Sequence, residues 1–158
     1  MIYTKILAPH DGSSSSEKAV EHAMELAKVT RAQIVFLHII PSIPIPPFID
    51  RTNPSFKTDK IVFSMSEHIK RNYLELRERA FQMLEEKKER CEVNGITVKL
   101  YVLSGQPVEN ILALAKTEKI DLIVMGTVRL KGLSKIKAFG SVARRVSENA
   151  ACAVLLIH

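Results

Sequence analysis

Two short segments of the sequence contain residue types that can bind a phosphorylated ligand. The first is PHDGSS at 9–14, whose carboxylate, Asp11, can accept hydrogen bonds from a ribose or a base edge. The second runs from GTVR at 126–129 to GSVA at 140–143. A Gly-Ser pair at a helix start offers backbone N–H groups, a hydroxyl and the positive end of the helix dipole, which together form an anion site. Each segment alone also has a plainer interpretation, a turn at 11–12 and a helix N-cap at 140–141.

Other catalytic and metal-binding patterns do not occur in the sequence. There is no GxxxxGK[ST], GxGxxG or GxSxG segment, so P-loop, dinucleotide-binding and α/β-hydrolase motifs are excluded. Cys91 and Cys152 are the only cysteines, and the five histidines lack metal-ligand spacing. Asp11 can hold a metal that bridges phosphates, but nothing resembles an efficient general base. We therefore expect no catalytic residue, no protein-built metal site and no enzyme.

Positive charge is concentrated near the second segment. The net charge is +6, and the stretch 129–145 contains six Lys or Arg residues and no Asp or Glu. This stretch indicates either an anionic partner or a solvated basic face. Nucleic acid is the less favoured partner, because Phe139 is the only aromatic residue there. The basic residues are Arg129, Lys131, Lys135, Lys137, Arg144 and Arg145.

The pattern of apolar residues predicts five strands that alternate with helices. Strands are expected at 3–8, 33–40, 97–103, 122–125 and 154–157. Capping boxes at 14–17 and 64–67 predict the starts of two helices, and Asn94-Gly95 predicts a left-handed stop. Two further helices are expected from Pro107 and over 140–148. Five of the seven prolines lie between 41 and 54, so 41–63 is expected to be irregular, as a lid, a partner loop or a surface insertion.

Strict alternation of strand and helix predicts a single α/β domain over 1–158. We expect one open, five-stranded parallel sheet of order 3-2-1-4-5, with helices on both faces. Ligands of such sheets bind outside the carboxyl ends of the strands, where the strand order reverses. That point lies between the first and fourth strands, directly before PHDGSS and GTVR. The two segments that can bind a phosphorylated ligand are therefore expected to meet.

The sequence resembles the universal stress protein family over essentially its whole length. KILAPHDGSSSSEKAVEHAMELA is similar to that family's first strand, Pro-x-Asp turn and first helix, and DLIVMGTVRLKGLSKIKAFGSVARRVSENAACAVLLIH is similar to its C-terminal half. The resemblance implies an adenine nucleotide alpha hydrolase-like fold that binds ATP or AMP. It places ten residues at the site: Pro9, Asp11, Ile39, Met125, Gly126, Arg129, Gly140, Ser141, Val142 and Ala143.

The chain departs from the family's nucleotide motif, G-x2-G-x9-G-[ST], at two points. Arg129 stands where the second glycine belongs, and the stretch from there to Gly140 is one residue longer than the pattern. The guanidinium of Arg129 can pair directly with phosphate, or the side chain can fill the pocket instead. Both interpretations stay open at the level of the sequence.

The function expected from these observations is regulatory binding of ATP or AMP, with a Mg²⁺ ion bridging the phosphates as an option. The alternative is a nucleotide-free, dimeric stress-response interaction protein. Family resemblance also implies a homodimer through the uncharged last strand, 152–157, and a protein partner that the sequence does not identify. No apolar run approaches the roughly 20 residues of a membrane helix, and residues 1–8 lack the features of a signal peptide. We therefore expect a cytoplasmic protein.

Overall fold

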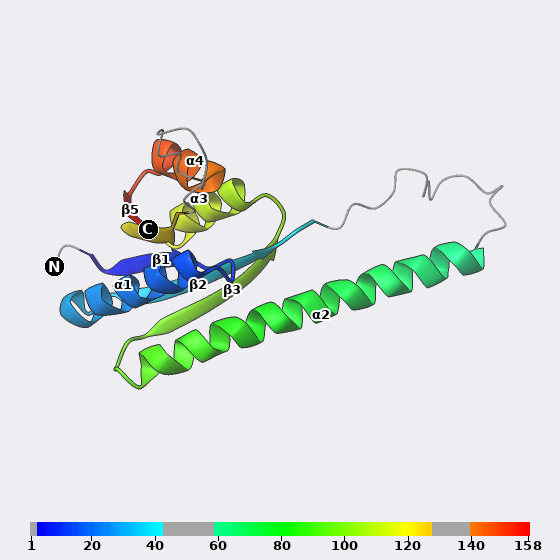
Figure 1. The fold of residues 1–158 in the computed structure, drawn as a ribbon, viewed down its shortest axis with the longest axis horizontal. Coiled ribbons are helices and arrows are strands. Elements are labelled where there is room, and N and C mark those ends of the chain that lie inside the picture. The colour runs from blue at the N-terminus through cyan, green and yellow to red at the C-terminus, as the bar shows by residue number, and fades with distance from the viewer. Residues whose placement is uncertain (1–2, 43–58, 128–139) are drawn as a thin grey trace.

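The computed structural model describes residues 3–42, 59–127 and 140–158 (Figure 1). Strands and helices alternate along the chain as expected. The elements are β1 (Lys5–Pro9), α1 (Ser14–Thr30), β2 (Gln33–Ile40), α2 (Asp59–Glu92), β3 (Val98–Ser104), α3 (Pro107–Thr117), β4 (Leu122–Gly126), α4 (Ser141–Asn149) and β5 (Ala153–Ile157).

The five strands form one parallel sheet in the order β3-β2-β1-β4-β5, which confirms the predicted topology. In the register of the central pair, Leu7 of β1 lies beside Ile123 of β4. The carboxyl ends of β1 and β4 therefore lie next to each other, and the strand order reverses there. This is the position at which the sequence placed the ligand site.

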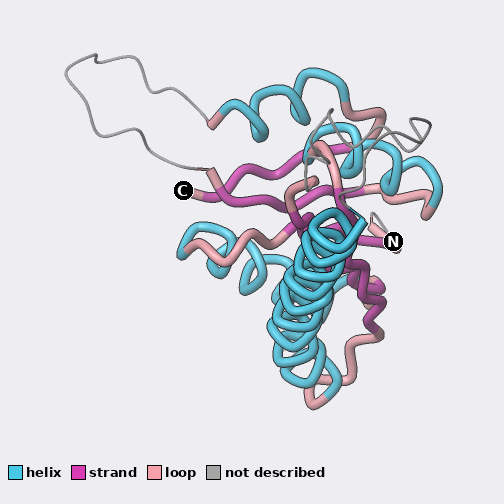
Figure 2. Tube along the Cα trace, turned by 90° about the vertical axis from the view of Figure 1, so that its right-hand side faces the viewer, coloured by secondary structure: helices cyan, strands magenta, loops and turns pink. Residues whose placement is uncertain are grey.

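Helices cover both faces of the sheet (Figure 2). Successive side chains of a strand point to opposite faces, so Ile6 and Ala8 of β1 pack with α1 and α2, whereas Leu7 packs with α3 and α4. All three side chains are fully buried. Each face therefore has its own hydrophobic core, and the sheet separates the two.

Pro9 is the last residue of β1, although proline is rare in a central strand. Pairing of β1 with β4 is confined to Ile6 and Leu7, while its pairing with β2 continues to Pro9. By Pro9 the ladder to β4 has ended, so the missing N–H group leaves no carbonyl of β4 without a donor. The predicted strand end at residue 8 was therefore one residue too early.

Helix α2 begins earlier than the sequence predicted. It starts at Asp59, inside the stretch 41–63 that was expected to be irregular, so Ser64 lies within the helix and does not cap it. The physical reason is composition, because the last proline of that stretch is Pro54 and no helix breaker follows it before Gly95. The predicted stop is confirmed, since Gly95 adopts a left-handed φ of 72°. Residues 43–58 lie outside the described part of the chain.

Only the C-terminal part of α2 packs against the sheet. Ala80, Leu84 and Cys91 are buried there, whereas Figure 1 shows the N-terminal part of the helix extending well beyond the strands. Among the described residues, no helix has the length and apolar character needed to cross a bilayer.

Candidate functional site

A cavity of about 290 Å³ opens at the carboxyl ends of β1 and β4. Nine of the ten predicted site residues line it, and the tenth, Arg129, lies outside the described residues. The nine come from four places in the chain, namely β1 and its loop, β2, β4 and the start of α4. They are Pro9, Asp11, Ile39, Met125, Gly126, Gly140, Ser141, Val142 and Ala143.

Seven further residues line the same cavity and were not predicted. They are His10, Ser13, Ser15, Ser16, Leu37, Pro107 and Ile111. Leu37 lies two residues before Ile39 on β2, so the alternation of side chains along a strand would have placed both on one face. Pro107 and Ile111 belong to the first turns of α3, which starts at the same edge of the sheet. The topology alone would have brought that helix start to the site.

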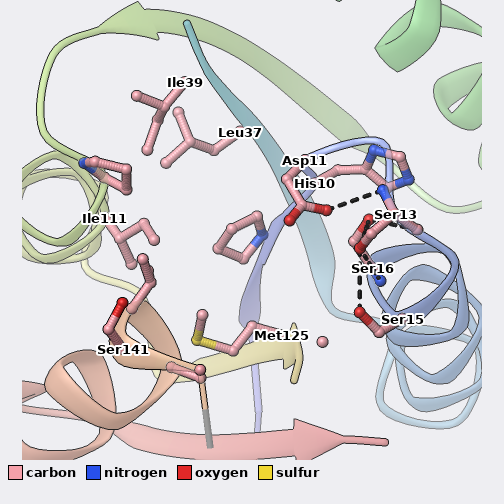
Figure 3. Close-up of a pocket in the computed structure, with 16 residues that line it drawn as sticks. His10, Asp11, Ser13, Ser15, Ser16, Leu37, Ile39, Ile111, Met125 and Ser141 are labelled. Carbon is pink, nitrogen blue, oxygen red and sulfur yellow. Dashed lines mark hydrogen bonds between the residues drawn. The ribbon is translucent and has the colours of Figure 1, made fainter. Parts of the chain in front are cut away.

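The cavity has an apolar side and a polar side (Figure 3). Leu37, Ile39 and Ile111 lie on one side, and Asp11 with the serines of the α1 start lies on the opposite side. A planar aromatic ring fits against aliphatic side chains of this kind, while the polar side offers hydrogen-bond partners. Such a combination is typical of small-molecule sites.

Asp11 is held in a tight turn. Its Oδ1 accepts a hydrogen bond of 3.0 Å from the backbone N–H of Ser13, and the intervening Gly12 has a φ of 86°. Burial by itself raises the pKa of Asp11, but the hydrogen bonds from Ser13, Ser16 and the Asp11 backbone together outweigh it and bring the pKa below its ordinary value. Asp11 is therefore ionised near neutral pH and acts as a hydrogen-bond acceptor towards the cavity.

His10 also stabilises this turn. Its side chain is buried, and its Nδ1 accepts a hydrogen bond of 3.2 Å from the N–H of Gly12. Nε2 therefore carries the proton and donates to Glu17 Oε2 at 3.1 Å. Burial lowers the pKa of His10 although Glu17 opposes the shift, so the imidazole is neutral. Although His10 borders the cavity, its ring points away from it, towards Glu17.

Glu17 connects the turn to α2. Its carboxylate lies 2.8 Å from Lys87 Nζ and 2.6 Å from Arg90 Nη1, and both of these residues belong to α2. Burial raises the pKa of Glu17, but hydrogen bonds from Lys87, Arg90 and His10 prevail and lower it to about 2. The predicted capping box is therefore wrong, because Glu17 binds these side chains and the N-cap is Ser13, whose Oγ accepts from the N–H of Ser16.

The structure explains why residue 126 is a glycine, which the sequence did not reveal. A Cβ at this position would lie 2.4 Å from the carbonyl carbon of Ser15 and 2.6 Å from the backbone nitrogen of Ser16. The first turn of α1 therefore passes directly over the end of β4. A side chain is excluded here by the protein backbone itself, whether or not a ligand also approaches.

The start of α4 provides the electropositive part of the site. Gly140 is the N-cap residue, and the first turn of α4 contains no acidic residue. The first N–H groups of a helix have no partner within the helix and lie at the positive end of its dipole. Ser141 adds a hydroxyl, and the burial of Ala143 and Val146 in the core anchors the helix. This end of the cavity is suited to an anion.

The chain matches one family over nearly its whole length. The sequence profile of the universal stress protein family covers residues 2–158. Universal stress protein MJ0531 of Methanocaldococcus jannaschii is 32% identical over 156 residues, which is 99% of this chain and 82% of that protein. The solved structure of hypothetical protein MJ0577 is similar with a TM-score of 0.75 at 27% identity, covering 99% of this chain and 96% of that one.

Two more distant structures share the fold and are complexes with nucleotides. One is a universal stress protein in complex with cAMP, at 22% identity and a TM-score of 0.64, covering 100% of this chain and 98% of that one. The other is the Archaeoglobus fulgidus universal stress protein in complex with dAMP, at 20% identity and a TM-score of 0.62, covering both chains fully. At these identities the likeness establishes the fold alone. The profile match and the close relative establish more, and this chain belongs to the universal stress protein family.

Proposed function

We propose that this protein binds an adenine nucleotide, ATP or AMP, in the cavity at the ends of β1 and β4, and that a partner protein reads its nucleotide state. The observation that carries the proposal is the arrangement of the cavity, in which an apolar wall, an ionised carboxylate and a helix N-terminus surround one space. Relatives of the same fold are described in complex with cAMP and dAMP, which supports the choice of nucleotide.

Electrostatics determines the orientation of the nucleotide. Asp11 is ionised and repels phosphate, so the phosphates belong at the start of α4, over residues 140–143. The adenine ring then lies against the apolar wall near Ile39, with Asp11 accepting hydrogen bonds from the base edge or the ribose. Arg129 is proposed as the counter-charge of the phosphates, a role that falls outside the described residues. The ribose crosses Gly126 between the two ends.

A divalent ion at this site would depend on the nucleotide for its ligands. Among the residues that the structure describes, no group of three or more His, Cys, Asp or Glu side chains is placed to hold a metal. Mg²⁺ commonly takes one or two carboxylates together with substrate phosphates and water. In the proposed orientation Asp11 lies at the adenosine end, so the phosphates and water would supply the ligands of an ion at the start of α4.

We also propose that the protein is a binding protein and not an enzyme. Both ring nitrogens of His10 are engaged, by Gly12 and by Glu17, so neither faces the cavity as a base. The lowered pKa of Asp11 makes its carboxylate a weak base. These residues suit binding better than proton transfer.

A homodimer through β5 is part of the proposal. β5 pairs with β4 and lies at the end of the strand order, and its sequence, AVLLI, carries no charge. Leu155 is 37% exposed on this edge. An uncharged edge strand is a template for pairing with another strand, and two-fold pairing with a second copy would cover it.

One observation favours the nucleotide-free alternative. Gly126 is required by the backbone of α1, and the Asp11 turn is fully held by Ser13 and His10. Both features exist without a ligand, so neither by itself requires one. The interaction-protein alternative therefore has structural support and needs a direct test.

Calorimetry with ATP, AMP and adenosine distinguishes the two functions. We expect wild type to bind ATP or AMP, and Ser141→Ala to lose affinity for both while keeping its affinity for adenosine. Ser147→Ala is the matched control, because Ser147 lies on the same helix and its Oγ donates to the carbonyl of Arg144. It should bind as wild type does.

Arg129→Gly tests the unusual residue of the motif. If Arg129 pairs with phosphate, affinity for ATP falls while that for adenosine is unchanged; if it fills the pocket, affinity for all three ligands rises. Failure of both wild type and Arg129→Gly to bind any of them would refute nucleotide binding and leave the interaction-protein function.

A further inference from the structure

One side of α2 carries exposed apolar residues that the fold does not use. Leu74 is 53% exposed and Phe81 is 47% exposed. They are two turns apart and so lie on the same side of the helix. Met83 approaches Gly12, and Lys87 and Arg90 form ion pairs with Glu17, so these three residues mark the side of α2 that faces α1. Helical spacing places Leu74 and Phe81 on the lateral side turned away from α1.

Charged residues flank Leu74 and Phe81 on α2. Their order is such that two antiparallel copies of the helix bring opposite charges together. Glu67, Lys70, Arg77, Glu78, Glu85 and Lys88 follow at spacings of three and four, together with Leu74 and Phe81. We call these eight residues the lateral stripe of α2. About a two-fold axis midway between residues 77 and 78, an antiparallel second copy places Leu74 against Phe81, Arg77 against Glu78, Lys70 against Glu85 and Glu67 against Lys88.

We propose that the lateral stripe of α2 binds the same stripe of a second copy of this chain in an antiparallel pair. In this arrangement every charge meets an opposite charge and each apolar residue meets the other. Within one chain, Lys88 Nζ already lies 2.6 Å from Glu85 Oε1. In the pair, the partner's Lys70 and the partner's Glu67 extend this contact into a network of four charges.

Other alignments of the two helices lose this match. An antiparallel pair centred on Leu74 places Phe81 against Glu67 and Arg77 against Arg71. A parallel, in-register pair brings each charge near its own copy. Like charges that face each other destabilise helix contacts, so the sequence of the stripe favours the register centred between 77 and 78.

The proposed contact is separate from the β5 edge. α2 packs on β2 and β3, and β3 and β5 are the two ends of the strand order. A chain with two different two-fold interfaces forms a closed tetramer or an open chain of dimers. The stripe is about 30 Å long and about 10 Å wide. Its area is therefore smaller than the roughly 800 Å² that each partner buries in a stable interface. The association is therefore expected to be weak and reversible, and to appear only at high protein concentration.

Sedimentation velocity over a wide concentration range, up to the millimolar, tests the proposal. Wild type should convert from its low-concentration species to species of at least twice the mass, and added salt should oppose the conversion. Arg77→Glu and Glu78→Arg should each weaken association about tenfold, because symmetry places each change at the interface twice. The double variant, Arg77→Glu with Glu78→Arg, should restore it. Phe81→Ser should weaken it as well.

Two controls complete the test. Val29→Ser changes an apolar residue that is 85% exposed on α1, and it should leave association unchanged. Leu156→Lys on β5, measured on the fraction that is not aggregated, should leave the concentration-dependent step in place, since the two interfaces are separate. The proposal is overturned if wild type keeps one mass over the whole range, if the double variant fails to restore association, or if either control abolishes the step. Circular dichroism confirms that each variant is folded.

Discussion

Replacement of Gly126 by alanine tests why this residue is a glycine. Either the backbone of α1 lies too close for a side chain, or a ligand approaches the residue closely. A Cβ at residue 126 would lie 2.4 Å from the carbonyl carbon of Ser15, whereas carbon atoms in favourable contact are about 3.5–4.0 Å apart. The start of α1 would have to move by about 1 Å to restore an ordinary contact. Ala19, Val20 and Ala23 of α1 have no exposed surface, so the helix cannot move without disturbing the core beneath it.

We expect Gly126→Ala to lower the free energy of unfolding by about 3 kcal/mol, at the upper end of the usual cost of overpacking, because the colliding atoms are backbone. This is a large fraction of the roughly 5–15 kcal/mol that stabilise a typical domain. Urea unfolding followed by circular dichroism measures it, and an m-value near 2 kcal/mol/M predicts a midpoint lower by about 1.5 M.

Gly12→Ala is the matched control, because it tests glycine geometry without a backbone collision. Gly12 has a φ of 86°, and the nearest atom to an added Cβ is Met83 Sδ at 4.0 Å. Its cost is therefore the left-handed conformation alone, about 1–2 kcal/mol. If Gly126→Ala unfolds within about 0.5 kcal/mol of wild type and loses only nucleotide affinity, the close approach of α1 is not the reason for the glycine, and our explanation is wrong.

Three further predictions concern the phosphate end, the dimer edge and the buried network. Ser141→Ala should reduce ATP affinity by about 1.5–3 kcal/mol if its hydroxyl donates to a charged phosphate, and calorimetry showing an equal loss for adenosine would contradict that placement. Leu156→Lys or Val154→Pro should give monomers or aggregates in light scattering, and intact dimers would exclude the β5 interface. Glu17→Gln should destabilise the protein at neutral pH. The pKa of Glu17 is lowered from 4.5 to about 2, so the stability that its carboxylate contributes is complete above pH 4.5 and is lost as the pH falls towards 2. If the difference in unfolding free energy between wild type and Glu17→Gln, measured by urea unfolding, stays constant from neutral pH to pH 3, this prediction is refuted.

The fold was predictable because local patterns and topology agree. Because crossover connections between parallel strands are right-handed, alternating strands and helices allow few arrangements. The observed parallel sheet brings PHDGSS and GTVR to one edge. The nine described site residues were predicted by resemblance, and they line one cavity. Their role as nucleotide ligands stays a prediction.

The contacts that hold the site together were not predictable from the sequence. Glu17 suggested a local capping box, yet its partner Arg90 lies 73 positions away on another helix. Likewise, the need for Gly126 depends on the path of Ser15 over β4, which no local pattern records. In both cases the contact joins elements that are far apart in the sequence. A sequence pattern describes only residues that are near each other along the chain.

The Asp11 side of the cavity is organised before any ligand binds. The backbone N–H of His10 donates to the carbonyl of Leu37 at 2.8 Å, and the carbonyl of His10 lies 2.7 Å from His38 Nδ1. With the bonds from Gly12 to His10 and from His10 to Glu17, the loop is tied directly to β2 and α1, and through the ion pairs of Glu17 to α2. A ligand that meets Asp11 therefore orders little of the chain on this side, and the entropy cost of binding there is small. It follows that any adenosine affinity reports this preformed half, while the difference between ATP, AMP and adenosine reports the start of α4.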